Sequence, residues 1–463
     1  MSVRTLFVVA VAATLAGCSM LRPYQRPATP VPSAFRDVPA DVAQLPALSP
    51  DWWRGFGSPP LDAMMIEATK NNQDIAAAIA RIREADAQTR IAGAPLLPTV
   101  DAGASGVRQK SPGSPLSSSK VGNDFALNLS ASYEIDFWGK NAAGLAAAQA
   151  SAQASRFDRQ VIQLTTQASV ATTDFDMLGT GDRLRAAQES LREAEDLLSA
   201  ERDRLKLGTA TDLDFVQQES VVATAKAAIP PLEQQIRQDA NALAVLLGKS
   251  PEQEEIEVGS LDALSIPGVA PGLPSTLLER RPDVREAEAN LVAANANIAA
   301  ARAAFFPSIS LTGELGFESA MLNTFLLPVS QLASIGAAAA QPIFHGGALE
   351  GNLEFTKARQ DELIATYRTA ILSALQDVEN ALIAVRKTAE EEESQRVAVT
   401  TAQRAYHLAT DQLTGGVTDI TTVLNTEKTL FQAQDARAQA RLAHVQAVVS
   451  LFKALGGGWN GQV

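Results

Sequence analysis

An internal repeat divides most of this chain of 463 residues into two copies of one unit. Four short motifs occur twice, the second time 207 to 209 residues after the first: those around Pro98 and Pro307, Phe137 and Phe344, Asp212 and Asp419, and Gly248 and Gly456. Four landmarks at nearly constant spacing are hard to obtain by chance. We therefore expect one unit over residues 61–270 and a second copy over residues 271–463.

Each copy is predicted to begin with a helix that leads into strands. Apolar residues recur at helical spacing over residues 61–92 and 283–304, which predicts the two opening helices. The period then changes to 2, because apolar and polar residues alternate over residues 124–137 and 308–318. This alternation predicts one clear strand in each copy.

A second, weaker strand is expected in each copy, at residues 99–108 and 333–341, which are rich in glycine and alanine. Strands of about ten residues that are apolar on one face and polar on the other are typical of transmembrane β-barrels. The same alternation occurs in a half-buried sheet of a soluble protein. The strands alone therefore leave both settings open.

Two long helices complete each copy and form a hairpin. Residues 139–207 and 347–413 contain no proline and are compatible with a helix almost throughout. A glycine-containing tip follows each run, near residues 208–211 and 415–418, and a return helix follows each tip. Antiparallel hairpins of this length are typical of a coiled-coil shaft.

The return helices have predicted N-terminal caps. Thr211 and Thr418 are the expected N-cap residues, because a hydroxyl oxygen accepts from the free N–H groups of the first turn. Asp212 and Asp419 would then lie in the first turn, where the helix dipole favours a carboxylate.

Composition excludes several classes of function. The chain is 46% hydrophobic but only 5% aromatic, which suits closely packed helices. Its net charge of −13 argues against a nucleic-acid partner. The three histidines lack the spacing of metal ligands, and no catalytic constellation is found. We expect neither an enzyme nor a bound cofactor.

The N-terminus has the pattern of a lipoprotein signal. Residues 1–17 place one basic residue before a short apolar run, and Cys18 follows Leu-Ala-Gly as in the bacterial lipobox. We expect a signal peptide at 1–17, a covalent lipid on Cys18, and a proline-rich strap over 18–60. The alternative is an ordinary signal peptide with an incidental cysteine. Cys18 is the only cysteine, so no internal disulfide is possible.

The expected strands require more than one chain. Two copies of the unit supply four strands, and four strands cannot close a barrel. An open sheet edge cannot face lipid, because its N–H and C=O groups would lack partners. If the sheet enters a membrane, at least two chains must combine, and the polar strand faces would line a lumen.

Six stretches carry a resemblance to a known family: WWRGFG at 52–57, YEIDFWGK at 133–140, GLPSTLLERRPDV at 272–284, QPIFHGG at 341–347, ALQDVENAL at 374–382 and KALGGGW at 453–459. Together with the repeat, they make the whole mature chain similar to the OprM/NodT branch of the TolC-like outer-membrane factor family. The stretch at 272–284 is the most diagnostic.

The resemblance implies a fold and a set of partners. The fold would be mainly α-helical with a β-barrel portion: a homotrimer sharing a twelve-stranded barrel in the outer membrane, with a helical tunnel in the periplasm. The partners would be outer-membrane lipid, a periplasmic adaptor protein and an inner-membrane pump of the resistance-nodulation-division type. The function would be passive efflux of small molecules. A type I protein secretion duct and a periplasmic structural lipoprotein are the alternatives.

The resemblance also places an entrance gate at the hairpin tips. Three copies of Asp212 and Asp419 would form a ring of carboxylates that attracts cations, although both could act only as helix caps. The positions of the family's usual lock are occupied here by Asn425, Leu413 and Thr414. We therefore expect a different gate, built with Asp419 and either Arg404 or Gln412. The tip residues expected to contact the adaptor are Gly208, Thr209, Thr211, Gly415, Gly416 and Thr418.

Overall fold

The structure is a computed structural model that describes residues 20, 22–36, 48–112, 120–253 and 259–459. The expected signal peptide and Cys18 lie outside the described residues. The chain forms two compact units. The first, here the sheet unit, comprises Met1–Thr29, Ala80–Arg156 and Glu286–Arg368, and the second, here the hairpin unit, comprises Pro30–Ile79, Phe157–Arg285 and Thr369–Val463.

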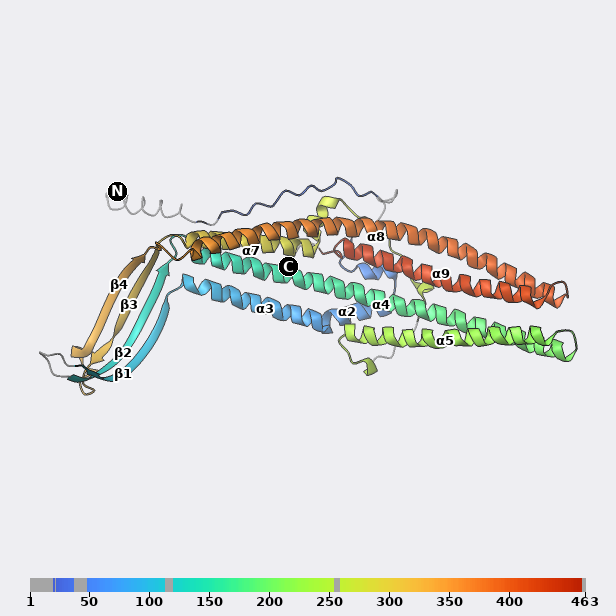
Figure 1. Cartoon of the computed structure of the whole chain (residues 1–463), viewed down its shortest axis with the longest axis horizontal. Coiled ribbons are helices and arrows are strands. Elements are labelled where there is room, and N and C mark those ends of the chain that lie inside the picture. The colour runs from blue at the N-terminus through green and yellow to red at the C-terminus, as the bar shows by residue number, and fades with distance from the viewer. Residues whose placement is uncertain (1–19, 21, 37–47, 113–119, 254–258, 460–463) are drawn as a thin grey trace. The chain divides into compact units, whose positions relative to one another are not determined.

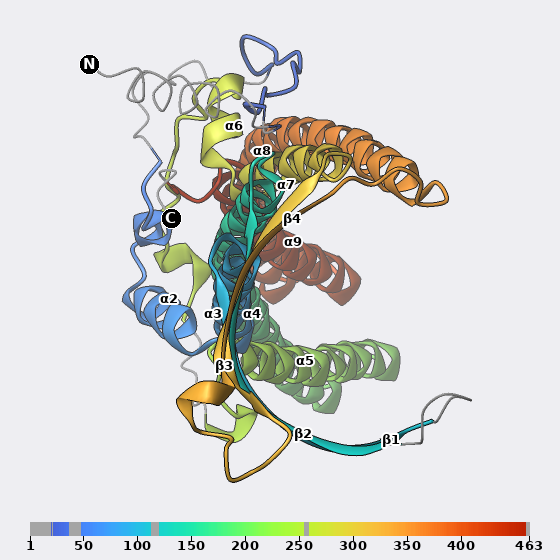
Figure 2. The ribbon, with the colours of Figure 1, turned by 90° about the vertical axis from the view of Figure 1, so that its left-hand side faces the viewer.

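The sheet unit contains one antiparallel sheet of four strands in the order β1-β2-β3-β4 (Figure 1). The strands are β1 (Thr99–Ser111), β2 (Lys120–Ile135), β3 (Ser308–Ser319) and β4 (Gln331–Ala340). Each of the four predicted strands is therefore present. The sheet is strongly curved (Figure 2). Pairing of β2 with β3 joins the two copies of the repeat in one sheet.

The end of β2 differs slightly from the prediction. The strand was expected to reach residue 137 but ends at Ile135. The reason is the next residue, Asp136, whose two carboxylate oxygens accept from the N–H groups of Asn141 and Ala142 at 3.0 and 2.7 Å. Asp136 thereby caps the helix that follows, and the chain leaves the sheet two residues early.

Long helices follow β2 and β4. They are α4 (Lys140–Lys206) and α8 (Ala348–Thr414), and each has 67 residues. The return helices α5 (Asp212–Leu246) and α9 (Ile420–Ala454) each have 35 residues. These identical lengths confirm the duplicated order of helix, strand, strand, helix, helix.

The first opening helix was predicted as one element over residues 61–92, and this is wrong. The structure has two helices, α2 (Pro59–Asn71) and α3 (Gln73–Gly93), separated at Asn72. The buried Asn72 side chain accepts from the N–H groups of Asp74 and Ile75 at 3.0 and 3.2 Å and donates to the carbonyl of Leu246 at 2.9 Å. Asparagine bonds of this kind compete with a continuous helix.

The second opening helix, α7 (Pro282–Ala303), matches its prediction closely. It is preceded by the short α6 (Leu277–Arg280). The short 3-10 helices are η2 (Trp52–Phe56), η3 (Ala94–Leu96), η4 (Pro251–Gln253), η5 (Leu261–Ala263), η6 (Pro274–Thr276) and η7 (Pro328–Ser330).

The core of the hairpin unit gathers around η2. Trp52 stacks on Phe452 of α9 with ring centroids 5.2 Å apart, and Phe56 contacts Phe175 of α4 at 4.9 Å. Both Trp52 and Phe56 are at least 98% buried. Such aromatic contacts add to the free energy of burial and tie the end of the strap to α4 and α9.

The two return helices end in the same way. Gly248 follows α5 and Gly456 follows α9, both with positive φ. A Cβ at Gly248 would lie 2.3 Å from the carbonyl oxygen of Asn71, and one at Gly456 would lie 2.3 Å from that of Arg280. Only glycine fits both the conformation and the close approach, so each copy needs it at this point.

Candidate functional site: sheet faces and hairpin tips

One face of the sheet is apolar across all four strands. The register pairs Leu129 with Leu315 and Tyr133 with Leu311 across β2 and β3. The outer strands continue this face with alanines and with Ile335, whose side chain is 94% exposed. Leu129 and Leu315 are also exposed, at 50% and 63%. An exposed apolar sheet face marks a surface that contacts an apolar environment.

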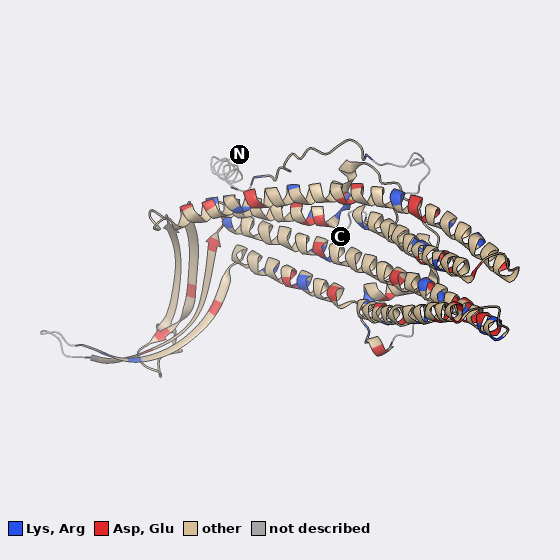
Figure 3. Ribbon diagram, turned by 45° about the vertical axis from the view of Figure 1, so that its right-hand side comes forward, with Lys and Arg blue, Asp and Glu red and all other residues tan. Residues whose placement is uncertain are grey.

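The opposite face is polar. Asn128 donates to the Glu314 carboxylate across β2 and β3 at 2.6 Å. Ser130 and Ser334 both lie opposite Glu314 in the neighbouring strands. Figure 3 shows that charged residues are sparse on the strands and frequent along the helices. The sheet thus separates an apolar face from a hydrated one.

The outer edges of the sheet are free within the described part of the chain. β1 pairs only with β2, and β4 pairs only with β3. All ten residues of β4 are exposed, and none is charged. An edge strand without charge or proline, such as β4, readily pairs with another strand. β1 carries Asp101, Arg108 and Lys110.

None of the described helices is long and apolar enough to cross a membrane.

Aromatic residues connect the sheet to the helices of the same unit. Trp138 stacks on Phe306 with ring centroids 4.7 Å apart. Its indole N–H donates to the carbonyl of Pro307 at 2.8 Å. This bond joins the turn after β2 to the turn before β3, so it fixes the two copies of the repeat to each other at the base of the sheet.

The tip of the first hairpin has the predicted cap. Gly208 has a φ of 72°, and the Thr209 N–H donates to the carbonyl of Arg204 at 2.9 Å. Thr211 is the N-cap, and its hydroxyl accepts from the Asp214 N–H at 3.2 Å, while Asp214 accepts from the Thr211 N–H at 2.8 Å. These bonds hold the pKa of Asp214 below its usual range. The exposed Asp212 begins α5.

The second tip differs from the prediction by one residue. Gly416 has a φ of 69°, as Gly208 does, but the N-cap of α9 is Asp419 and not Thr418. The Asp419 carboxylate accepts from the N–H and the hydroxyl of Thr422, both at 2.9 Å. Aspartate is one of the strongest N-cap residues, so α9 begins one residue later than expected.

The other gate candidates occupy different environments. Leu413 is buried in an apolar cluster with Ala402, Tyr406, Ala409, Ile420, Val423 and Leu430. Thr414 is exposed, and its hydroxyl donates to the carbonyl of Thr410 at 2.9 Å. Asn425 is exposed on α9. The hydrogen bonds of the described residues include none from Asp419 to Arg404 or Gln412. A gating role for these residues stays a prediction.

A buried acidic group near this tip was missed from the sequence. Glu427 is 3% exposed, and neither carboxylate oxygen has a hydrogen-bond partner among the residues that the structure describes. Burial, together with the nearby Glu193, raises the pKa of Glu427 to about 7. Burial, with the charges of Glu427 and Glu193, also raises the pKa of Tyr406 to about 12. The sequence does contain a pattern that indicates this burial. The 3-4-3 spacing of a helix seam links Ile420, Val423, Glu427 and Leu430.

A groove between α5 and α9 lies over this group. It has a volume of about 420 Å³ and is lined by residues of both helices and by Ser190 of α4. Its apolar wall includes Val221, Ala225 and Phe431, and its polar wall includes Ser220, Thr224 and Asn425. Asn425 and Glu427 therefore border the same space.

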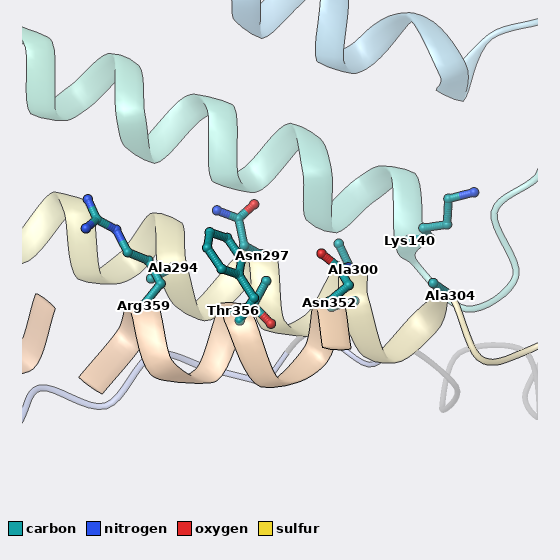
Figure 4. A pocket seen from close by; sticks show the side chains of 10 residues that line it. Lys140, Ala294, Asn297, Ala300, Ala304, Asn352, Thr356 and Arg359 are labelled. Carbon is teal, nitrogen blue, oxygen red and sulfur yellow. The ribbon is translucent and has the colours of Figure 1, made fainter. Parts of the chain in front are cut away.

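A second groove, in the sheet unit, has a volume of about 400 Å³. Figure 4 shows side chains from α7 and α8 on opposite sides of it, with Lys140 at one end and Arg359 toward the other. Four of its ten lining residues are alanine, and Asn297, Asn352, Phe355 and Thr356 are among the others. No carboxylate or histidine lines the groove, so it offers neither an acid–base pair nor ligands for a metal.

The described part of the chain contains no cluster of three or more potential metal ligands. His444 is paired with Glu392, since its Nδ1 lies 2.6 Å from a carboxylate oxygen. Arg441 donates to the same carboxylate at 2.9 Å. The pair stabilises contact between α8 and α9.

The strap is attached to each unit by hydrogen bonds. In the sheet unit, Arg26 makes a bidentate ion pair with Glu288 of α7 at 2.6 and 2.8 Å. The carbonyl of Arg22 accepts from Asn295 at 3.0 Å. In the hairpin unit, the Arg36 N–H donates to Glu379 of α8 at 3.1 Å. The strap is thus held by α7 at Arg22 and Arg26 and by α8 at Arg36.

Comparison with known proteins gives consistent matches over the whole chain. The family model described as outer membrane efflux protein matches twice, at residues 65–249 and 273–457. The pyoverdine export outer membrane protein OpmQ of Pseudomonas aeruginosa is 38% identical over 468 residues, which cover 99% of this chain and 98% of that protein.

Two further matches are also outer membrane export or channel proteins. The protein of the same name from Pseudomonas putida is 41% identical over 447 residues, covering 93% of this chain and 94% of that protein. The open state of the Neisseria gonorrhoeae MtrE outer membrane channel is 30% identical, with a TM-score of 0.87 over 96% of this chain and 100% of the other. From the repeat, the two-faced sheet and these matches, the chain belongs to the outer membrane efflux protein family.

Proposed function

We propose that three copies of this chain form one lipid-anchored duct in the outer membrane, which receives small molecules from a periplasmic adaptor and an inner-membrane pump. Members of the family are efflux proteins and not enzymes, so the chain serves transport through the outer membrane. The observation that carries the assembly is the sheet, which has an exposed apolar face and two free edges.

Closure of the sheet needs other copies. Pairing of the β4 edge of one copy with the β1 edge of the next satisfies the unpaired N–H and C=O groups that lipid would leave without partners. Three copies of four strands give twelve, an even number within the range of bacterial outer-membrane barrels. The polar face with Glu314 then lines the lumen.

The hairpin unit offers a surface for the same contact. Leu372, Ile383, Val397 and Leu408 of α8 are exposed by 42 to 61%. Their spacings of 11, 14 and 11 residues place them on one line of the helix, within about 40° at 100° per residue. These four residues, here the stripe, share the line with Glu379 and Glu390. We propose that a neighbouring copy packs on the apolar members of the stripe.

Two features support the proposed lipid anchor: Cys18 and the hydrogen bonds that attach the strap. Two or more acyl chains on one cysteine give stable membrane attachment. Ion pairing of Arg26 with Glu288 then keeps the strap on the body of the same chain. Labelled palmitate incorporated into the wild-type chain but not into Cys18→Ala would support the anchor, and equal labelling of both would exclude it.

The cargo is proposed to be a small molecule. The two OpmQ proteins are named for pyoverdine export, which supports a low-molecular-weight cargo over the polypeptide of a type I secretion duct. The tips with Gly208 and Gly416 are the proposed contact with the adaptor. Export of a pyoverdine-type compound by a strain lacking its own duct, restored by this chain, would support this cargo, and restoration of protein secretion alone would contradict it.

The membrane role of the sheet is tested by two neighbouring residues of β4. Ile335→Arg places a charge on the apolar face, at a cost of about 2–4 kcal/mol near the bilayer midplane. Ser334→Arg places the same charge on the polar face and is the control. We expect Ile335→Arg to lower the amount of assembled protein in outer membranes and Ser334→Arg to assemble normally. Equal assembly of both variants would contradict the proposal.

A further inference from the structure

The groove between α5 and α9 combines an apolar lining with a buried carboxylate that no side chain neutralises. Glu427 lines this groove and is 3% exposed, and both of its oxygens lack a hydrogen-bond partner. A buried carboxylate is ordinarily paired or hydrogen-bonded, because its transfer from water is costly. Such a group is neutralised either by a proton or by a positive donor.

The rest of the groove fits a compound with an apolar body. Val221, Ala225 and Phe431 supply apolar contacts, while Ser220, Thr224 and Asn425 supply hydroxyl and amide groups at the rim. A volume of about 420 Å³ is within the range of small-molecule sites. Among the lining residues, Lys428 is the only cationic one.

We propose that this groove binds organic cations, compounds that carry a protonated amine or amidinium group on a small apolar body, with the Glu427 carboxylate as partner of the positive group. Binding requires the carboxylate to turn toward the groove, where a charge-assisted hydrogen bond replaces its unpaired state. The site goes beyond the proposed function, because its occupation is a property of the hairpin unit and does not depend on transport.

The charges around Glu427 favour a cation. Glu193 and Asp196 of α4 add negative charge, and Tyr406 of α8 lies close enough for its ionisation to be affected by Glu427. His407 of α8 interacts with Glu193, and Lys428 follows Glu427 on α9. The α5 residues that line the groove carry no charge. The acidic groups therefore outnumber the cationic ones at this site.

Proton and cation compete for the same carboxylate. Since the pKa of Glu427 is raised to about 7, the group is mostly protonated at pH 6 and mostly ionised at pH 8. Affinity for a permanently charged amidinium should therefore rise about 10-fold between these pH values. Affinity for a neutral compound of the same shape should not change.

The test uses the full-length protein from membranes, placed in lipid nanodiscs, with benzamidine as the cation and benzamide as its neutral counterpart. Calorimetric titration at pH 8 should show benzamidine binding at least about 10-fold more tightly than benzamide. Glu427→Gln should abolish this preference. Glu219→Gln, which changes an exposed residue 208 positions earlier on α5, is the matched control and should retain it.

A second variant tests the groove without changing the carboxylate. Ala225→Phe fills the space and should weaken binding of both compounds. The proposal is overturned if wild type shows no preference for benzamidine, if Glu427→Gln keeps the preference, or if Glu219→Gln loses it. Each of these outcomes is independent of whether the duct conducts, so failure of the site and failure of the proposed function are distinguishable.

Discussion

Among the described residues of the hairpin unit, Asp174 and Glu427 are buried carboxylates that are not fully hydrogen-bonded and whose pKa is raised. Asp174 is 4% exposed and Glu427 is 3% exposed. Burial raises the pKa of each to about 7. The helical spacing of the apolar residues around Glu427 could have indicated its burial, but the absence of a partner depends on three helices that are distant in sequence. The sequence could therefore indicate that Glu427 is buried, but not that it lacks a partner.

These groups should make stability depend on pH. The folded pKa lies above the unfolded value, so protonated Glu427 favours folding below about pH 4.5, and this contribution is lost as pH rises toward 7. A shift of this size corresponds to roughly 3 kcal/mol. Glu427→Gln should be more stable than wild type at pH 8 and nearly equal to it at pH 4.5, as measured by denaturant unfolding of the hairpin helices.

Asp174→Asn should behave in the same way, because it removes a second buried carboxylate with a raised pKa. Exposed Glu219→Gln is the control and should leave the pH dependence unchanged. Stability profiles that stay parallel in wild type and Glu427→Gln from pH 4.5 to 8 would show that Glu427 ionises as freely as in the unfolded chain.

Asp419 combines a structural role with a charge at the tip. Asparagine caps a helix about as well as aspartate, so Asp419→Asn keeps the cap and removes the charge. If Asp419 belongs to a cation-attracting ring, this variant should lower cation selectivity in planar bilayers with little change in stability. Asp419→Ala should in addition cost about 1 kcal/mol of stability. Selectivity identical to wild type in Asp419→Asn would limit the residue to capping.

At the level of helices and strands, the sequence was sufficient wherever local pattern decides the structure. Absence of proline predicted α4 and α8 to within one residue, and the alternation of apolar residues predicted β2 and β3. It was insufficient at Asn72, since the bond from that side chain to Leu246 joins segments far apart in the chain. The cap at Asp419 was missed because Thr418 is also a plausible cap.

Substitution by alanine should cost different amounts of stability at Gly208, in the first hairpin tip, and at Gly248, after the end of α5. Gly208 has positive φ but open space around a Cβ, so Gly208→Ala should cost about 1 kcal/mol. Gly248 has the same φ and also lies against the Asn71 carbonyl, so Gly248→Ala should cost roughly 2 kcal/mol more. Denaturant midpoints of the two variants measure the difference. Equal midpoints would mean that the contact at Asn71 relaxes without cost.

For the whole molecule, duplication explains both the helices and the sheet. The chain is an outer-membrane efflux channel protein, built from two copies of one unit. The sequence predicted the two faces of the sheet, because a period of 2 assigns each side chain to a face. It did not predict that β2 pairs with β3, since that pairing crosses from one copy to the other. Free edges at β1 and β4 follow from that order.

The stripe on α8 gives an assembly prediction of its own. Leu408→Glu should weaken association of the copies in detergent, because it places a charge within a contact proposed to be apolar. Gln403→Glu, which adds a charge at an exposed position about 140° around the helix from Leu408, is the control. Size-exclusion chromatography measures the dissociation of subunits in each variant, and Leu408→Glu should dissociate more readily than the control. Equal dissociation of the two variants would show that the stripe is not part of the interface.

The central claim, that three lipid-anchored copies share one barrel, is tested most directly by native mass spectrometry of the protein extracted from outer membranes. We predict a trimer in which each subunit lacks residues 1–17 and carries the added mass of covalent acyl chains. The Cys18→Ala variant should lack this added mass. A water-soluble monomer without acyl mass would contradict it, and would make the exposed apolar face of the sheet a contact surface for something other than lipid.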